Sequence, residues 1–136
     1  MSEASMLKEF LELVQIPVQS RDERKIAHVV KQKLLDLGLT VEEDKAGEKL
    51  GGNTGNLIGR LAGASEVPSI LLSAHLDRVR NSGAIHPVVN EAEDLIKSDG
   101  TSILAADDVS GLCAVLDGLR RVKESGKPHG PVEVVF

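Results

Sequence analysis

One run of apolar and small residues, Ile70 to Ala74, limits the possible folds of this chain more than any other feature. A strand with one face in water alternates apolar and polar side chains, whereas a strand covered on both faces is apolar throughout. The run therefore predicts an interior strand, buried on both faces, that ends at His75. Interior strands of this kind are typical of sheets with helices packed on both sides.

The residues around this run alternate between helical and strand patterns. Apolar residues at helical spacing predict three helices, over 6–14, 26–37 and 112–122. Ser20 to Glu23 has the spacing of a capping box at the start of the second helix. Further strands are expected at 39–44, 57–61, 95–96 and 132–136, and a glycine-rich loop at 45–55.

This order of elements predicts an α/β fold, a three-layer sandwich with a mainly parallel central sheet. The chain ends within its last predicted strand, so we expect a truncated version of that fold. In such folds a functional site is expected beyond the carboxyl ends of the strands, where His75 and the loop before the third helix would both lie.

Composition argues against several classes of function. The chain carries 16 Lys and Arg against 21 Asp and Glu, a net charge of −5, and two Phe are its only aromatic residues. A nucleic-acid surface needs clustered cations and usually stacking rings, so we expect no nucleic-acid partner. No apolar stretch is long enough for a membrane span, and Glu3 stands where a secretory signal would carry Lys or Arg, which together predict a cytoplasmic protein. The single cysteine, Cys113, is expected to be a small buried hydrophobe of the third helix.

The first candidate site is His75-Leu76-Asp77, at the end of the apolar run. Side chains alternate along a strand, so His75 and Asp77 point to the same side. A carboxylate in this position can accept the imidazole N–H and fix which ring nitrogen faces a metal. The alternative is a polar strand exit with a solvated histidine.

The second candidate is the pair Asp107-Asp108, which leads into the third helix. Either carboxylate could cap the helix, a contribution of about 1 kcal/mol. A cap explains neither the Asp99-Gly100-Thr101 turn eight residues earlier nor the His75 motif. A carboxylate that bridges two cations would need both.

Together these segments resemble the two metal motifs of the dinuclear-zinc exopeptidases, a family that includes peptidase T, carboxypeptidase G, aminoacylases and succinyl-diaminopimelate desuccinylase. The segments are Ala74 to Asp77, Ser98 to Thr101 and Ala106 to Asp108. The resemblance is strongest to the peptidase T-like branch, the tripeptide aminopeptidases, and extends over nearly the whole chain. It implies that residues 1–136 are the N-terminal part of a zinc-peptidase catalytic domain.

The resemblance also implies a role for each motif residue. His75 would ligate one of two zinc ions, Asp107 would bridge both, and Asp77 would act as the catalytic residue that orients His75. The family has a cis peptide bond after the bridging aspartate. Cobalt or manganese are expected substitutes for zinc, and a short peptide that loses its N-terminal residue is the expected substrate.

The chain departs from the family pattern at Arg78 and Val109, where a cation is gained and a cation is lost near the expected metals. Such changes would alter substrate choice or mark a degenerate site. The family's general-base glutamate, its remaining metal ligands and its lid domain have no counterpart in this sequence, so we expect this chain alone to be inactive. The alternatives are a non-catalytic α/β module or pseudo-enzyme and an N-acyl amino acid amidohydrolase. Association of copies through the exposed sheet edge is a further expectation.

Overall fold

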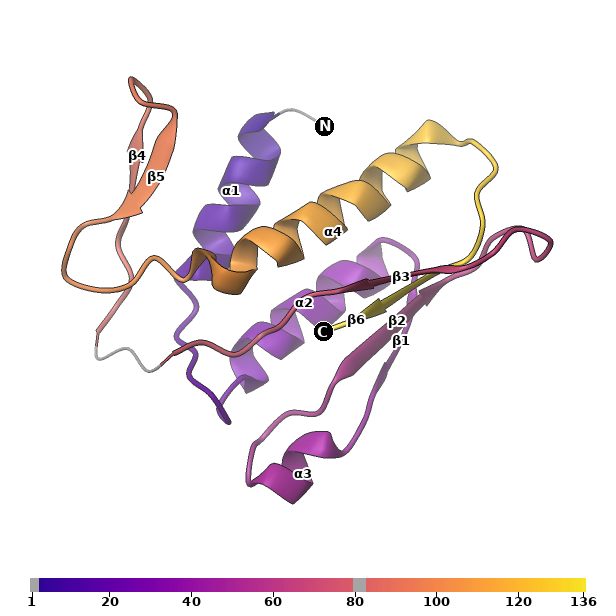
Figure 1. Ribbon diagram of the computed structural model, residues 1–136, viewed down its shortest axis with the longest axis horizontal. Coiled ribbons are helices and arrows are strands. Elements are labelled where there is room, and N and C mark those ends of the chain that lie inside the picture. Colours follow the sequence, from indigo (N-terminus) through magenta and orange to yellow (C-terminus); the bar gives the residue numbers. More distant parts are fainter. Residues whose placement is uncertain (1–2, 80–82) are drawn as a thin grey trace.

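The computed structural model describes residues 3–79 and 83–136 (Figure 1). Met1 and Ser2, which belong to the segment considered above as a secretory signal, lie outside the described residues. The elements in chain order are α1 (Glu3–Val14), α2 (Arg24–Asp36), β1 (Thr40–Glu43), α3 (Ala46–Leu50), β2 (Leu57–Leu61), β3 (Ile70–Ser73), β4 (Pro87–Asn90), β5 (Leu95–Ser98), α4 (Ala106–Ser125) and β6 (Val132–Val135). Among the described residues, no helix combines the length and apolarity that a membrane span requires.

Four strands form the central sheet, in the order β1-β2-β6-β3. The predicted α/β class is confirmed, but the sheet is mixed where a mainly parallel one was expected. β1 and β2 pair antiparallel, as do β2 and β6, and only β3 and β6 are parallel. A parallel pair needs a crossover connection, and α4 supplies it between β3 and β6.

One face of this sheet is covered by helices. Leu57, Val132 and Val134 point into a single core that also contains buried side chains of α2 and α4. Gly59 leaves room on this face for the side chain of its β6 neighbour, because a Cβ there would lie 2.8 Å from Val134 Cγ2. Figure 1 shows α4 running above the sheet with α1 beside it, and the β4–β5 hairpin standing away from the sheet.

The opposite face is largely open in the described part of the chain. It carries Arg60, which forms ion pairs with Glu42 at 3.3 Å and with Glu133 at 3.2 Å. It also carries Leu71, whose register partner on β6 is Glu133. The described residues therefore form two of the three expected layers, the sheet and the helices on one of its faces.

β3 differs most from its prediction. It lies at the edge of the sheet, and Ile70 and Leu71 are 55% and 61% exposed. The expectation of a strand buried on both faces is therefore wrong for the described residues. An apolar run indicates that a strand can be covered on both sides, but here only β6 pairs with β3 and helices pack on one face alone.

Two elements, α3 and β4, were not predicted. The expected loop at 45–55 contains α3, which ends at Gly51 in the left-handed conformation, with φ of 71°. The strand expected at 95–96 extends over 95–98 and pairs with β4 as a hairpin. β4 offered little signal, because only two apolar residues stand between Pro87 and Asn90.

Candidate metal centre

The two motifs meet at one point on the surface. His75 follows the end of β3 by two residues, and Asp107 lies at the entrance of α4. The Nε2 atom of His75 is 2.8 Å from Asp107 Oδ1, although the residues are thirty-two positions apart. The expected approach of the two side chains is thus observed. The Asp107 side chain is 93% exposed and that of His75 50% exposed, so solvent and dissolved cations can reach the pair.

Asp77 lies on the other side of the imidazole ring. His75 Nδ1 is 3.1 Å from the Asp77 backbone oxygen and 3.1 Å from Asp77 Oδ1. This is the position expected for a residue that orients the ring. The second carboxylate oxygen, Asp77 Oδ2, accepts a hydrogen bond of 2.7 Å from the hydroxyl of Ser20.

Ser20 was missed as a site residue because its sequence context predicts a helix cap. The structure corrects that prediction: α2 begins at Arg24, its N-cap residue is Glu23, and no side chain caps it. The Ser20 hydroxyl is bonded to Asp77 instead, fifty-seven positions away. Nothing local in the sequence signals that contact.

The two aspartates at the entrance of α4, Asp107 and Asp108, make different contacts. The backbones of Asp107 and Asp108 are non-helical, and the peptide bond between them is cis, as the resemblance implies. Asp108 Oδ1 accepts the Gly111 N–H at 3.1 Å, as a helix cap does. Asp108 Oδ2 accepts the backbone N–H of His75 at 3.3 Å. The capping alternative therefore applies to Asp108 and leaves the Asp107 carboxylate facing the imidazole.

Two carboxylates contact the imidazole of His75, and the charge of a third, that of Asp108, also acts on it. Burial disfavours the charged ring, but the hydrogen bond to Asp107 and the charges of Asp77 and Asp108 outweigh it, so the pKa of His75 is raised. A site that attracts a proton in this way also attracts a metal cation, and the two compete for the same nitrogen.

The two residues that depart from the family pattern are both buried. Arg78 is buried, and its guanidinium donates hydrogen bonds to backbone oxygens at the end of α1 and just beyond it, at 2.8 Å to Leu13, 3.0 Å to Val14 and 2.8 Å to Ile16. Val109 is 1% exposed and belongs to the core. The Arg78 guanidinium is therefore turned toward the end of α1, and the expected effect of these two departures on substrate choice stays a prediction.

The donor set fits part of a metal site. An imidazole nitrogen and a carboxylate oxygen this close can contact one cation, and both are ordinary zinc ligands. Within residues 3–79 and 83–136, however, no three side chains of His, Cys, Asp or Glu are grouped so that they could hold a metal ion. Stable zinc sites use three or four protein ligands, so these residues supply two of them.

A hollow of about 450 Å³ opens beside the imidazole. Its lining includes Ser20, His75 and Asp77 on one side and the segment 46–56 on the other. Leu76 and Phe136 also line it and make part of its wall apolar. The hollow is large enough for a small ligand that contacts the ring.

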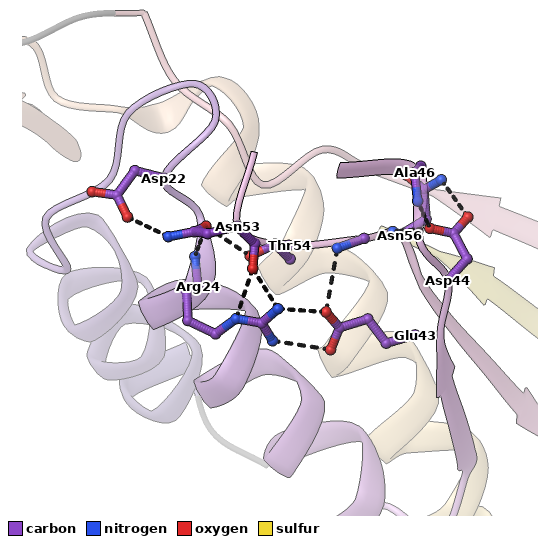
Figure 2. Close-up of polar contacts among 9 residues, drawn as sticks. Asp22, Arg24, Glu43, Asp44, Ala46, Asn53, Thr54 and Asn56 are labelled. Carbon is purple, nitrogen blue, oxygen red and sulfur yellow. Dashed lines mark hydrogen bonds and ion pairs between the residues drawn. The ribbon is translucent and has the colours of Figure 1, made fainter. Parts of the chain in front are cut away.

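Polar contacts hold the segment 46–56 against β1 and the start of α2, as Figure 2 shows. Arg24 binds Glu43 with two hydrogen bonds, of 3.0 and 2.7 Å. The Asn53 side chain accepts the Arg24 backbone N–H at 3.1 Å and donates to Asp22 at 2.6 Å. The hydrogen bond from Arg24 lowers the pKa of Glu43 despite partial burial of the carboxylate. Side-chain contacts between residues far apart in the sequence therefore hold the segment 46–56, which forms one wall of the hollow.

Comparisons with known proteins bear on the family resemblance. No family model matches the chain. YqjE of Bacillus subtilis, a protein described as uncharacterized, is 38% identical over 135 residues, which cover 99% of this chain and 36% of that protein. The structure of a Staphylococcus aureus tripeptidase has a TM-score of 0.92 and 38% identity, and that of the aminopeptidase PepT of Bacillus cereus has 0.92 and 35%.

Each of these structural matches covers 99% of this chain and 36% of the other protein. The chain thus spans a little over a third of the length of the relatives that it matches. Identity at this level over the whole chain, together with near-superposable folds, confirms the resemblance drawn from the motifs. In sequence and in fold, the chain therefore groups with the peptidase T-like exopeptidases.

Proposed function

We propose that residues 1–136 form the N-terminal part of the catalytic domain of a zinc-dependent, peptidase T-like aminopeptidase. The observation that carries the proposal is the 2.8 Å approach of His75 Nε2 to Asp107 Oδ1. Strand alternation and a helix entrance bring together donors from two distant motifs, as a shared cation would require.

Each residue has a defined role in this proposal. His75 would hold one metal ion, Asp107 would contribute to both metal sites, and Asp77 would orient His75 from the Nδ1 side. The chemistry supplied by metal ions held there would be a lower pKa for a bound water and polarisation of a substrate carbonyl. Zinc is the proposed metal, with cobalt or manganese as substitutes. The substrate is a short peptide that enters from the hollow beside His75, and the proposed location is the cytoplasm.

A non-catalytic module is the second candidate, because the described residues supply only two donors of one potential metal site. On that basis we expect this chain to bind zinc weakly and to hydrolyse no peptide by itself. Any longer protein that contains it is expected to remove the N-terminal residue from di- and tripeptides when supplied with zinc, cobalt or manganese.

Zinc content after equilibrium dialysis against a fixed concentration of dissolved zinc tests the metal site. We expect the zinc bound by the wild-type protein to be lost in His75→Ala and in Asp107→Ala. The exposed residue His28 provides a matched control, and His28→Ala should keep its zinc. Zinc content that is indifferent to both site substitutions would refute the proposed centre. In a longer protein that contains this chain, peptide hydrolysis that survives His75→Ala would refute the catalytic role.

We also propose that β3 favours self-association, because its outer edge has no strand partner among the described residues and Leu71 is exposed. Sedimentation velocity should detect concentration-dependent dimers that Leu71→Lys removes. A wild-type protein that stays monomeric at high concentration would contradict this.

A further inference from the structure

The turn between α1 and α2 is held against the segment that carries the site. Asp22 N–H donates to Gln19 O at 2.9 Å, which closes a tight turn with Ser20 inside it. Ser20 then makes two contacts with consecutive residues: its N–H donates to Arg78 O at 3.3 Å, and its hydroxyl donates to Asp77 Oδ2 at 2.7 Å. The position of this hydroxyl is thus set by backbone contacts as well as by its own bond.

The Arg78 side chain also holds the turn between α1 and α2 in place. It binds the backbone oxygens of Leu13, Val14 and Ile16, which lead into the turn. The turn is therefore fixed at its start by Arg78 and near its middle by Ser20. The hydroxyl of Ser20 has little freedom to leave Asp77.

We propose that Ser20 is a positioning residue of the metal centre, and that its hydroxyl holds Asp77 so that the other carboxylate oxygen stays on His75 Nδ1. The Asp77 side chain is half exposed, so without a partner it can turn toward water. An acceptor fixed at Nδ1 favours the proton on that nitrogen and leaves the Nε2 lone pair available to a cation held beside Asp107. The metal part of this inference rests on the proposed function, but the effect of Ser20 on the ring does not.

The first test is the ratio of the two neutral tautomers of His75, measured by ¹⁵N NMR of the metal-free protein at a pH where the ring is uncharged. Ser20→Ala should shift the ratio toward the form protonated on Nε2. Ser20→Thr, which keeps a hydroxyl, should restore the wild-type ratio. The matched control is Ser125→Ala, which removes an exposed hydroxyl bonded to Val122 O at the far end of α4. An unchanged ratio in Ser20→Ala would overturn the proposal.

The second test is a Co²⁺ titration of the same variants followed by absorption spectroscopy. Removing a direct partner of a metal-bound histidine costs about 10–100-fold in metal affinity. Ser20 acts one contact further away, so we expect Ser20→Ala to weaken binding by about threefold to tenfold. Ser20→Thr and Ser125→Ala should bind as the wild type does. Equal affinity in Ser20→Ala and wild type would overturn the positioning role.

The two tests separate failure of this inference from failure of the proposed function. Co²⁺ binding by the wild type that does not depend on His75 would refute the metal centre, and the tautomer ratio would still decide the role of Ser20. Co²⁺ binding that depends on His75 but not on Ser20 would support the centre and refute the role of Ser20.

Discussion

Replacing Arg78 by Met should destabilise the protein strongly, because the guanidinium satisfies three backbone oxygens where α1 ends. The donor–acceptor distances are 2.8, 3.0 and 2.8 Å, and the residue is 3% exposed. Met keeps much of the aliphatic volume but removes every donor. The oxygens of Leu13, Val14 and Ile16 would then lose a partner in a site that water reaches poorly.

The magnitude follows from the hydrogen bonds and the burial of the charge. A hydrogen bond to a charged group contributes about 1.5–3 kcal/mol, and three would give about 4.5 kcal/mol at the lower figure. Burial lowers the pKa of Arg78, and its Nε finds no acceptor among the described residues, so desolvation offsets part of that sum. We therefore expect a loss of about 3 kcal/mol, which is about 100-fold in the ratio of folded to unfolded protein.

Urea unfolding followed by circular dichroism measures this loss as a change in midpoint at constant slope. Arg78→Lys should recover less than half of it, because one ammonium group cannot reach three oxygens as a planar guanidinium does. The control is Arg60→Met, which removes only exposed, solvent-screened ion pairs and should leave the midpoint close to that of the wild type. A loss below about 1 kcal/mol in Arg78→Met, or full recovery in Arg78→Lys, would refute this reasoning.

Three further predictions concern the core and the wall of the hollow. Burial raises the pKa of Cys113 to about 12, so its thiol should react with a disulfide reagent only after unfolding, and fast labelling of the native protein would contradict this. Gly59→Ala should lower the free energy of unfolding by about 1–3 kcal/mol, measured by urea unfolding, because its Cβ would lie 2.8 Å from Val134 Cγ2. The pKa of Glu43 is lowered in the folded state, so its contribution is present above the ordinary carboxyl range and is lost as the pH falls through the lowered value. Glu43→Gln should therefore flatten the loss of stability in acid, and an unchanged acid profile would contradict the Arg24 contact.

His75, Asp77 and Asp107 could be predicted as site residues because the position of each follows from a local rule of strand or helix geometry. His75 and Asp77 share a side because strand side chains alternate, and Asp107 stands at a predicted helix entrance. The link between the two motifs needed only the rule that strand ends and helix entrances meet at one edge of a sheet. The observed approach of His75 to Asp107 follows from those rules.

Other features depend on contacts that a local pattern does not encode. Ser20 has the spacing of a helix cap, yet its hydroxyl bonds to Asp77 far along the chain. Arg78 is a charged residue in a polar motif, but its guanidinium is buried, where it binds the backbone oxygens at the end of α1. The run that forms β3 is apolar throughout, yet Ile70 is exposed because its environment is decided by neighbouring elements, not by its own residues.

An anomalous difference map from a crystal soaked in zinc tests the central claim most directly. The account predicts a peak within about 2.0–2.2 Å of both His75 Nε2 and a carboxylate oxygen of Asp107, with Asp77 still on the Nδ1 side of the ring. A zinc-soaked crystal in which His75 and Asp107 remain hydrogen-bonded to each other, with no peak between them, would contradict it.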